Sequence, residues 1–205
     1  MGRKTNKHRK NVKKAIGESS KVNQMKSKVV APRYYAILPK VDLEAVMGDI
    51  LSAEDTPKGA KKMWGLLKGK KRFTARPHIT ITHMKSKDTE LALWNASAQL
   101  LKKGTRPMFT LEFGHLIWND RVMALTVENL SVKEDSATKA GKEWLNVLRD
   151  GPVRARLHIT VGTADPSIPP VEAKLLVEKW KAQEPVGVME ITGIESQGPL
   201  KALVH

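Results

Sequence analysis

The sequence predicts an α+β domain in which an order of strand and helix from the first half recurs in the second half. Three observations support this fold class. Strand-like runs alternate with helical stretches, two strands carry the same six-residue pattern, and 205 residues suffice for one core. The chain contains no Cys, which excludes disulfide scaffolds, thiol nucleophiles and thiolate zinc sites. No apolar run reaches about 18 residues, so no membrane span is expected.

In the first half, Pro39 and Gly104 mark two of the element boundaries. Pro39 ends an apolar run that is too short for a helix, and Gly104 stands where helices commonly stop. The elements expected are a strand over 34–38, helices over 41–52 and 58–67, a strand over 76–84, a helix over 89–103, and a hairpin of strands over 108–118 and 122–128.

The second half repeats this order of elements. Gly151 and Pro152 end its first helical stretch, and Pro169 and Pro170 open its second, since proline is favourable in a first helical turn. The elements expected are a helix over 135–148, a strand over 156–163, a helix over 169–182, and strands over 186–194 and 200–204.

Positive charge is concentrated at the N-terminus. The chain has 36 Lys and Arg against 21 Asp and Glu, a net charge of +15. Residues 1–30 hold ten of the basic residues and one acid, Glu18, so this segment carries +9 and the other 175 residues carry +6. We expect 1–30 to be a flexible tail or linker, because it has too little apolar surface to fold. It serves either as a salt-sensitive arm for RNA or DNA or as a solvated linker, and 31–205 is the expected folded domain.

A short internal repeat is the most informative feature of the sequence. Residues 76–81 and 156–161 both read Arg-x-His-Ile-Thr-aliphatic, and they lie 80 positions apart. A single His-x-Thr arises easily by chance, but two copies with matching flanks do not. We therefore expect the two strands to share a function.

Strand geometry predicts what each copy presents. Successive side chains point to opposite faces, so His78 and Thr80 share one face of the first strand, and His158 and Thr160 share one face of the second. The aliphatic side chains between them are expected to pack on helices. On the same reasoning His83 falls on the face opposite His78, so the two are not expected to share a metal site.

The paired side chains suit cleavage of a phosphodiester without a metal. Near neutral pH one imidazole can accept a proton while the other donates one, and displacement at phosphorus needs both tasks. The Thr hydroxyls can donate hydrogen bonds to phosphate oxygens whose charge grows in the transition state. His78, His158, Thr80 and Thr160 are therefore the candidate catalytic residues.

Other residues near the motifs are candidates for binding the substrate. Arg76 and Arg156 share the faces of the motif histidines if the strands extend that far, and they either bind phosphate or are solvated. Aromatic residues stack on bases of single-stranded RNA, although core packing is the common alternative for each of Tyr34, Tyr35, Phe73 and Trp118. The candidates, with the basic cluster over 68–72 included, are Arg76, Arg156, Tyr35, Lys70 and Arg72.

Paired His-x-Thr motifs make the sequence resemble the two-histidine phosphoesterase superfamily. The second motif continues as His-Ile-Thr-Val-Gly-Thr over 158–163. Together with the basic approach and the C-terminal ending, it resembles the cyclic phosphodiesterase domain at the C-terminus of fungal tRNA ligases. The resemblance covers about residues 33–205, and some ten positions carry it.

This resemblance implies a bilobal fold of two pseudo-symmetric lobes, each with a mainly antiparallel concave sheet flanked by helices, and an active site between them. It implies general acid and base roles for His78 and His158, and phosphate binding by Thr80 and Thr160. The implied substrate is an RNA 2′,3′-cyclic phosphate end, as on tRNA exon halves in splicing, opened to a 2′-phosphate and a 3′-hydroxyl. No metal or other cofactor is implied. We favour His158 as the base.

Alternatives of two classes stay open. The same fold acts on a small cyclic nucleotide, a 2′,5′-oligoadenylate or ADP-ribose 1″,2″-cyclic phosphate, or the chain is a non-catalytic RNA-binding module. No kinase or ligase motif is visible, so we expect an isolated third domain whose partners are the ligase and kinase domains of one polypeptide. A monomer in the cytoplasm or nucleus, without membrane contact, is expected.

Overall fold

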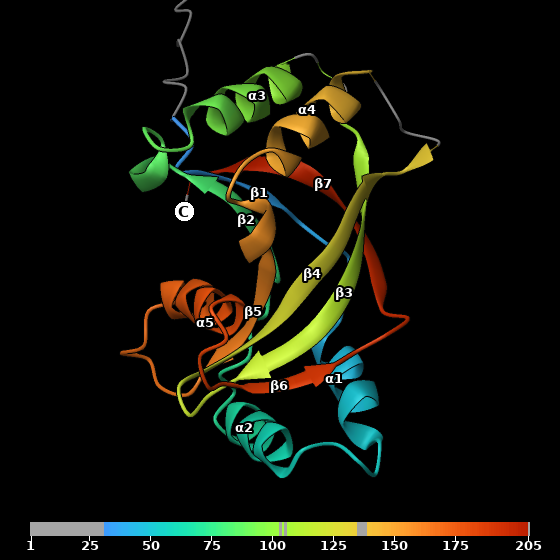
Figure 1. The fold of residues 1–205 in the computed structure, drawn as a ribbon, viewed down its shortest axis with the longest axis vertical. Helices are drawn as coiled ribbons and strands as arrows, with labels where there is room; N and C mark the ends of the chain where they lie inside the picture. Colours follow the sequence, from blue (N-terminus) through green and yellow to red (C-terminus); the bar gives the residue numbers. More distant parts are fainter. Residues whose placement is uncertain (1–30, 103, 105, 135–138, 205) are drawn as a thin grey trace, which may run out of the picture. The chain divides into compact units, whose positions relative to one another are not determined.

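The computed structural model describes residues 31–102, 104, 106–134 and 139–204 (Figure 1). These residues belong to one compact unit, Ala31–His205, and the N-terminal tail expected over 1–30 lies outside the described residues. The strands are β1 Tyr34–Ile37, β2 Ile79–His83, β3 Met108–Trp118, β4 Val122–Val132, β5 His158–Thr163, β6 Gly187–Glu190 and β7 Glu195–Leu203. The helices are α1 Leu43–Ser52, α2 Lys58–Gly69, α3 Leu91–Lys102, α4 Lys139–Arg149 and α5 Val171–Lys181. The α+β class is confirmed.

Every strand pair in the described sheet is antiparallel, in the order β2-β1-β7-β3-β4-β5 with β6 beside β3. Strand β7 joins two smaller sheets. Its first half, Glu195–Pro199, pairs with β3, and its second half, Leu200–Leu203, pairs with β1. The two lobes implied by the resemblance are therefore continuous through β7, and the strands that carry the two motifs lie at opposite ends of the strand order.

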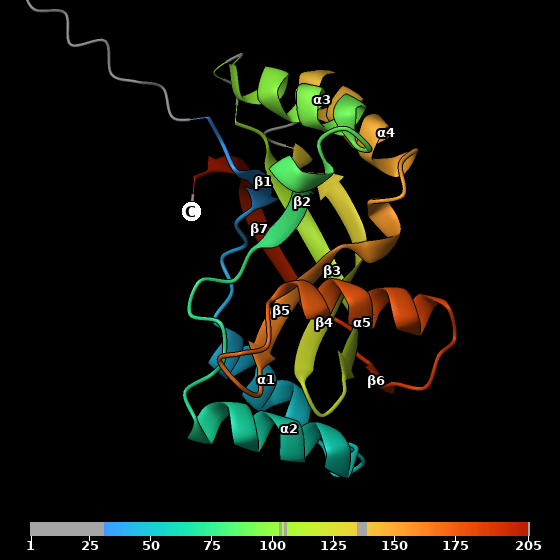
Figure 2. The same cartoon turned by 90° about the vertical axis from the view of Figure 1, so that its left-hand side faces the viewer.

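The sheet carries apolar side chains on both faces of β3 and β4. The larger core lies on one face and includes Leu125, Ile159 and Ile79, with side chains from α1 to α4. A smaller core lies on the other face, where Ile117 and Ala124 pack against α5. Figures 1 and 2 show α3 beside α4, while α5 lies against β5. Helices therefore cover parts of both faces, whereas they were expected on the aliphatic face of the motif strands.

The connection from α2 to β2 adds to the outer edge of β5. The Thr74 amide donates to the Val161 carbonyl at 2.8 Å, and Phe73 forms a β-bridge with Gly162. A Cβ atom on Gly162 would lie 2.6 Å from the Arg72 carbonyl oxygen, so only glycine permits this approach. The chain that leads into the first motif is thus held directly against the strand of the second.

Lys71 turns the chain from α2 toward this edge. Its φ of 52° lies in the left-handed region, which side-chain-bearing residues adopt rarely and which commonly follows the end of a helix. The Arg72 amide then donates to the Leu67 carbonyl at 2.7 Å, which satisfies one of the last carbonyls of α2. Helix α2 therefore ends where the chain must cross to β5.

The motif strands are shorter than the sequence predicted. β2 begins at Ile79 and β5 at His158, whereas the expected strands began at Arg76 and Arg156. Pro77 supplies no amide hydrogen for pairing before β2, and Arg154–Arg156 form a single 3-10 turn before β5. None of the helices in the described part of the chain is long and apolar enough to cross a membrane.

Replacement of Gly162 by Ala tests the contact between the α2–β2 connection and β5. We expect the free energy of unfolding to fall by about 1–3 kcal/mol, because the new Cβ has no room beside the Arg72 carbonyl and Leu67. Gly48→Ala in α1 is the matched control, since a Cβ there meets no atom within 4 Å and should stabilise the helix by about 0.5–1 kcal/mol. Denaturant unfolding measures both, and equal midpoints for the two variants would contradict the role of Gly162.

Candidate functional site

The structure brings the two motif strands together. β2 and β5 contact each other although they stand at the two ends of the strand order. His78 immediately precedes β2, His158 is the first residue of β5, and both side chains are half-buried. Thr80 is exposed and Thr160 is half-buried. His78 also contributes to lowering the pKa of His158, so the two imidazoles are close enough to interact electrostatically.

The two motifs share a second structural feature, a β-bulge directly after the Thr. In β2 the pairing passes from Thr80 to Thr82, so Ile81 has no partner on β1. In β5 the pairing passes from Thr160 to Gly162, so Val161 has no partner on β4. The internal repeat therefore extends from sequence to backbone geometry, because an extra residue interrupts both ladders at the same point.

Both histidines are held in the same orientation by their own backbone. The Nδ1–H of His78 donates to the Arg76 carbonyl at 3.2 Å, and the Nδ1–H of His158 donates to the Arg156 carbonyl at 2.8 Å. A carbonyl oxygen only accepts, so this contact places the proton of the neutral ring on Nδ1. In each ring Nε2 is then the nitrogen that remains for proton transfer.

His158 lies in a more enclosed environment because α5 covers its face of the sheet. Thr160 pairs with Ala124, and residues that pair across strands share a face. Ala124 packs on α5 in the smaller core, so His158 and Thr160 lie on the α5 side. Burial is the largest cause that lowers the pKa of His158 below its ordinary value of 6.5, and Glu178 of α5 opposes it. The ring is therefore predominantly neutral at pH 7.

The aromatic neighbour of the first motif is Tyr34, not Tyr35. Tyr34 pairs with His83, and its ring centroid lies 5.7 Å from that of His78 and 5.9 Å from that of His83. Tyr35 is buried and meets the Trp94 ring edge-on at 4.8 Å, so it packs in the core, and substrate binding by Tyr35 stays an untested prediction. The alternation of side chains along residues 34–37 could have predicted this burial. Tyr35 and Ile37 point to the same face of the strand, and Ile37 is an apolar residue that belongs in the core.

The bulge at Ile81 also corrects the expected position of His83. One extra residue reverses the alternation, so His83 lies on the same face as Thr80 and stacks on Tyr34 with an angle of 11° between the ring planes. The Lys85 amide donates to His83 Nδ1 at 3.0 Å. Within the described residues no group of three or more His, Asp or Glu is arranged to hold a metal ion.

The two motif arginines lie outside the strands. Arg156 forms an ion pair with Glu90, whose side chain is 5% exposed. This pair anchors the turn whose carbonyl orients His158. Arg76 is exposed in the loop before β2. The expectation that both share the strand faces of the histidines fails because the strands begin after them, and Arg156 in addition already has a partner.

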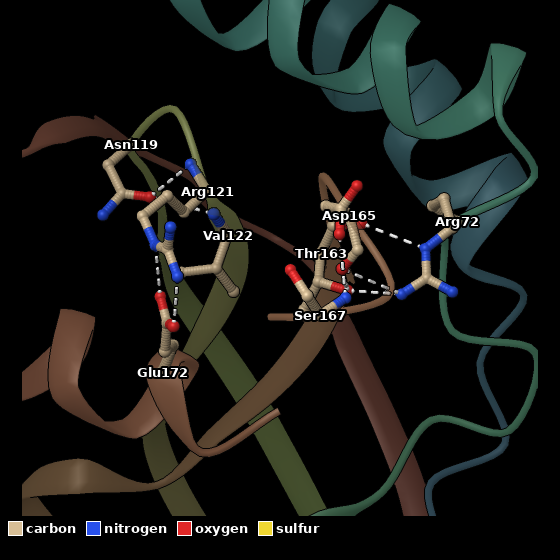
Figure 3. A network of polar contacts seen from close by, with 8 residues as sticks. All are labelled: Arg72, Asn119, Arg121, Val122, Thr163, Asp165, Ser167 and Glu172. Carbon is tan, nitrogen blue, oxygen red and sulfur yellow. Dashed lines mark hydrogen bonds and ion pairs between the residues drawn. The ribbon is translucent and has the colours of Figure 1, made fainter. Parts of the chain in front are cut away.

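Arg72 is occupied by the end of β5, as Figure 3 shows. Its Nη2 donates to Thr163 Oγ1 at 2.8 Å and to the Asp165 carbonyl at 3.3 Å, and its Nε donates to the Thr163 carbonyl at 3.4 Å. Lys70 is exposed, and its charge helps to lower the pKa of Asp165, after the hydrogen bonds from Ser167. Arg72 is therefore a structural link between the α2–β2 connection and the end of β5, while Lys70 faces solvent.

A second cluster in Figure 3 closes the β3–β4 hairpin. Asn119 Oδ1 accepts from the amides of Arg121 and Val122, both at 2.9 Å, and the Arg121 guanidinium binds both carboxylate oxygens of Glu172 at 2.6 and 2.7 Å. This bidentate pair fastens the start of α5 to the hairpin. It thereby fixes the helix that encloses His158.

Comparison with known proteins identifies the family. The family described as fungal tRNA ligase phosphodiesterase domain matches residues 1–205, the whole chain. The chain belongs to this family. It is therefore an enzyme of the cyclic phosphodiesterase class.

One curated relative is tRNA ligase 1 of Schizosaccharomyces pombe, which is 26% identical over 162 residues. The alignment covers 75% of this chain and 18% of that protein, so the chain spans less than a fifth of the length of this relative. The crystal structure of a fungal RNA kinase has the same fold, with a TM-score of 0.55 and 16% identity. That match covers 84% of this chain and 45% of the kinase chain.

The Glu90–Arg156 ion pair can be tested as a support for His158. We expect Glu90→Gln to lower the free energy of unfolding by about 3 kcal/mol, because it leaves a partly buried guanidinium without its charge partner. Phosphodiesterase kcat should fall while KM changes little, since the Arg156 carbonyl orients His158. Glu143→Gln removes an exposed pair with Lys139 and is the matched control, with little change in stability. A Glu90→Gln enzyme with wild-type kcat would exclude the positioning role.

Proposed function

We propose that the chain hydrolyses RNA 2′,3′-cyclic phosphate ends to a 2′-phosphate and a 3′-hydroxyl, without a metal ion. The observation that supports this proposal most is the convergence of two His-x-Thr strands that share a bulge and a ring orientation. Two imidazoles that interact across one site provide the base and the acid that in-line displacement requires. The whole tRNA ligase relative is much longer, so the RNA substrate and the companion ligase and kinase domains are part of this proposal.

In the proposed mechanism His158 is the base and His78 the acid. Neutral His158 accepts a proton from water at Nε2, and the water oxygen forms a bond to phosphorus. The bond from phosphorus to the ribose 3′-oxygen breaks, and His78, which enters the step as an imidazolium with a proton on each ring nitrogen, gives its Nε2 proton to that oxygen. The phosphate stays on the 2′-oxygen, so atoms and charge balance. Thr80 and Thr160 donate hydrogen bonds to the nonbridging oxygens as their charge increases.

The enclosed position of His158 supports this assignment. A base must be neutral before the reaction, and burial under α5 favours the neutral form of this ring. His78 lies before an exposed Thr at a strand end, with Tyr34 as its aromatic neighbour. Substrate binding by Arg76, which is exposed two residues before His78, stays a prediction, as does that by Lys70, which is exposed near Asp165.

Product analysis tests the proposed reaction. An oligonucleotide with a 2′,3′-cyclic phosphate is incubated with the wild type, His78→Ala and His158→Ala in the presence of a chelator. We expect a 2′-phosphate product with the wild type, and a rate reduced by about 100- to 10,000-fold with either variant. His83→Ala is the matched control, because His83 lies outside both motifs. Retained activity in either motif variant, or loss of wild-type activity in chelator, would falsify the two-histidine mechanism.

The pH dependence tests which histidine is the base. The base must be neutral, so kcat/KM falls as the pH drops through the pKa of His158. Because burial lowers that pKa, we expect the acidic limb below pH 6.5. Glu178→Gln removes a charge that raises the pKa, so the limb should move to still lower pH. Glu184→Gln, at an exposed position after α5, should leave it in place. An acidic limb that does not respond to Glu178→Gln contradicts His158 as the base.

A further inference from the structure

A basic cavity lies beside the second motif, outside the residues assigned above. Its volume is about 370 Å³, which is in the range of ligand sites in proteins. Arg149 from the last turn of α4, Arg154 from the turn before β5 and Lys181 from the last turn of α5 line it, and Glu128 of β4 is the acidic residue there. Three separate elements thus contribute a cation to one concave surface.

Internal contacts fix the base of this cavity and leave its two rim cations accessible. Arg154 donates to the Val127 carbonyl at 3.2 Å and also to the Glu128 carbonyl, so its guanidinium is held in place. Arg149 and Lys181 are exposed, and Lys181 Nζ lies 4.2 Å from the centre of the Trp180 ring. Among the ion pairs of the described residues, neither has a carboxylate partner.

The cations are close enough to influence one another. Burial is the main cause that lowers the pKa of Arg154, Glu128 raises it, and Arg149 lowers it further. Like charges that gather without enough acid to balance them favour an anion at the same place. With three cations and one carboxylate, the lining carries a net charge of +2.

On three elements, a residue that lines the cavity is separated by only two to four positions from His158 or from a residue that pairs or interacts with it. Thr126 pairs with His158, and Glu128 follows two residues later on β4. Glu178 acts on His158, and Lys181 follows three residues later on α5. Arg154 precedes His158 by four residues. Two residues of an extended β-strand span about 7 Å. In an RNA strand with stacked bases, successive phosphates are separated by roughly 3.4 Å along the strand axis. Along β4, Glu128 in the lining of the cavity therefore lies about 7 Å from the residue that pairs with His158, which corresponds to about two nucleotides of RNA.

We propose that this cavity binds a backbone phosphate of the RNA strand, about two nucleotides upstream of the cyclic end. The inference rests on the proposed function and specifies the substrate of that site. A 2′,3′-cyclic phosphate closes the 3′ end of a strand, so the rest of the RNA extends only in the 5′ direction. Phosphodiester groups carry the charge that Arg and Lys neutralise without reading sequence. A cyclic mononucleotide has no such upstream phosphate and cannot use the cavity.

The test removes the rim charges and compares two substrates. The full chain with Arg149→Gln and Lys181→Gln is assayed on a tetranucleotide with a 2′,3′-cyclic phosphate end and on a 2′,3′-cyclic mononucleotide. Loss of one phosphate contact weakens single-strand binding about fivefold at 0.1 M salt, so KM for the tetranucleotide should rise about fivefold. The kcat/KM for the mononucleotide should stay at the wild-type value. Lys58→Gln with Lys62→Gln, two exposed positions on one face of α2, is the charge-matched control.

A binding measurement separates failure of this inference from failure of the proposed reaction. Fluorescence anisotropy of a labelled tetranucleotide gives the salt dependence of binding, whose slope should fall by about 0.7 in the double variant, since one phosphate contact contributes about 0.7. Unchanged slope and unchanged KM overturn the inference. An equal loss on both substrates also overturns it, since the residues would then serve the reacting end itself. If the wild type opens neither substrate, the proposed function fails, and the slope alone decides the inference.

Discussion

The contact between residues 72–74 and the edge of β5 is the constraint on which the site depends. Neighbouring strands lie about 4.8 Å apart, so the ends of a flat path of six strands would be separated by roughly 24 Å. The sheet instead brings β2 and β5 into contact. Thr74 bonds to Val161, Phe73 bridges to Gly162 and Arg72 binds Thr163, only a few residues before the first motif histidine. The two motifs therefore converge by direct backbone pairing as well as by curvature of the sheet.

The same β-bulge occurs in both motif strands but has a different structural consequence in each. In β2 it restores His83 to the face of Thr80, which lets Tyr34 contact two histidines. In β5 the residue after the bulge is Gly162, whose missing side chain admits the α2–β2 connection. The first bulge thus shapes the surface beside the imidazole, and the second maintains the distance between the strands. Both follow the Thr directly, so neither disturbs the spacing between His and Thr.

The sequence predicted the fold class, the order of the elements and the repeat, because these depend on local periodicity. The bulges were not predictable from alternation, and they reversed the expected face of His83. The internal contacts of Tyr35, Arg72 and Arg156 were not predictable for a different reason. Each is of a residue type that binds RNA, yet each makes a long-range contact within the protein, with Trp94, Thr163 and Glu90 respectively. Such contacts connect segments far apart in the chain, and composition near a motif does not encode them.

The two motifs match in pattern, but their histidines differ in chemistry because different groups pack beside them. The backbone treats both rings alike, since each Nδ1–H bonds to the carbonyl two residues earlier. Helix α5 breaks this symmetry: it covers the face that His158 shares with Ala124, while a tyrosine ring lies beside His78. Burial disfavours a charged imidazole, so the covered ring is suited to accept a proton. The Arg121–Glu172 pair holds the start of that helix, and α5 ends with Lys181 at the basic cavity. One helix therefore links the choice of base to the proposed path of the RNA.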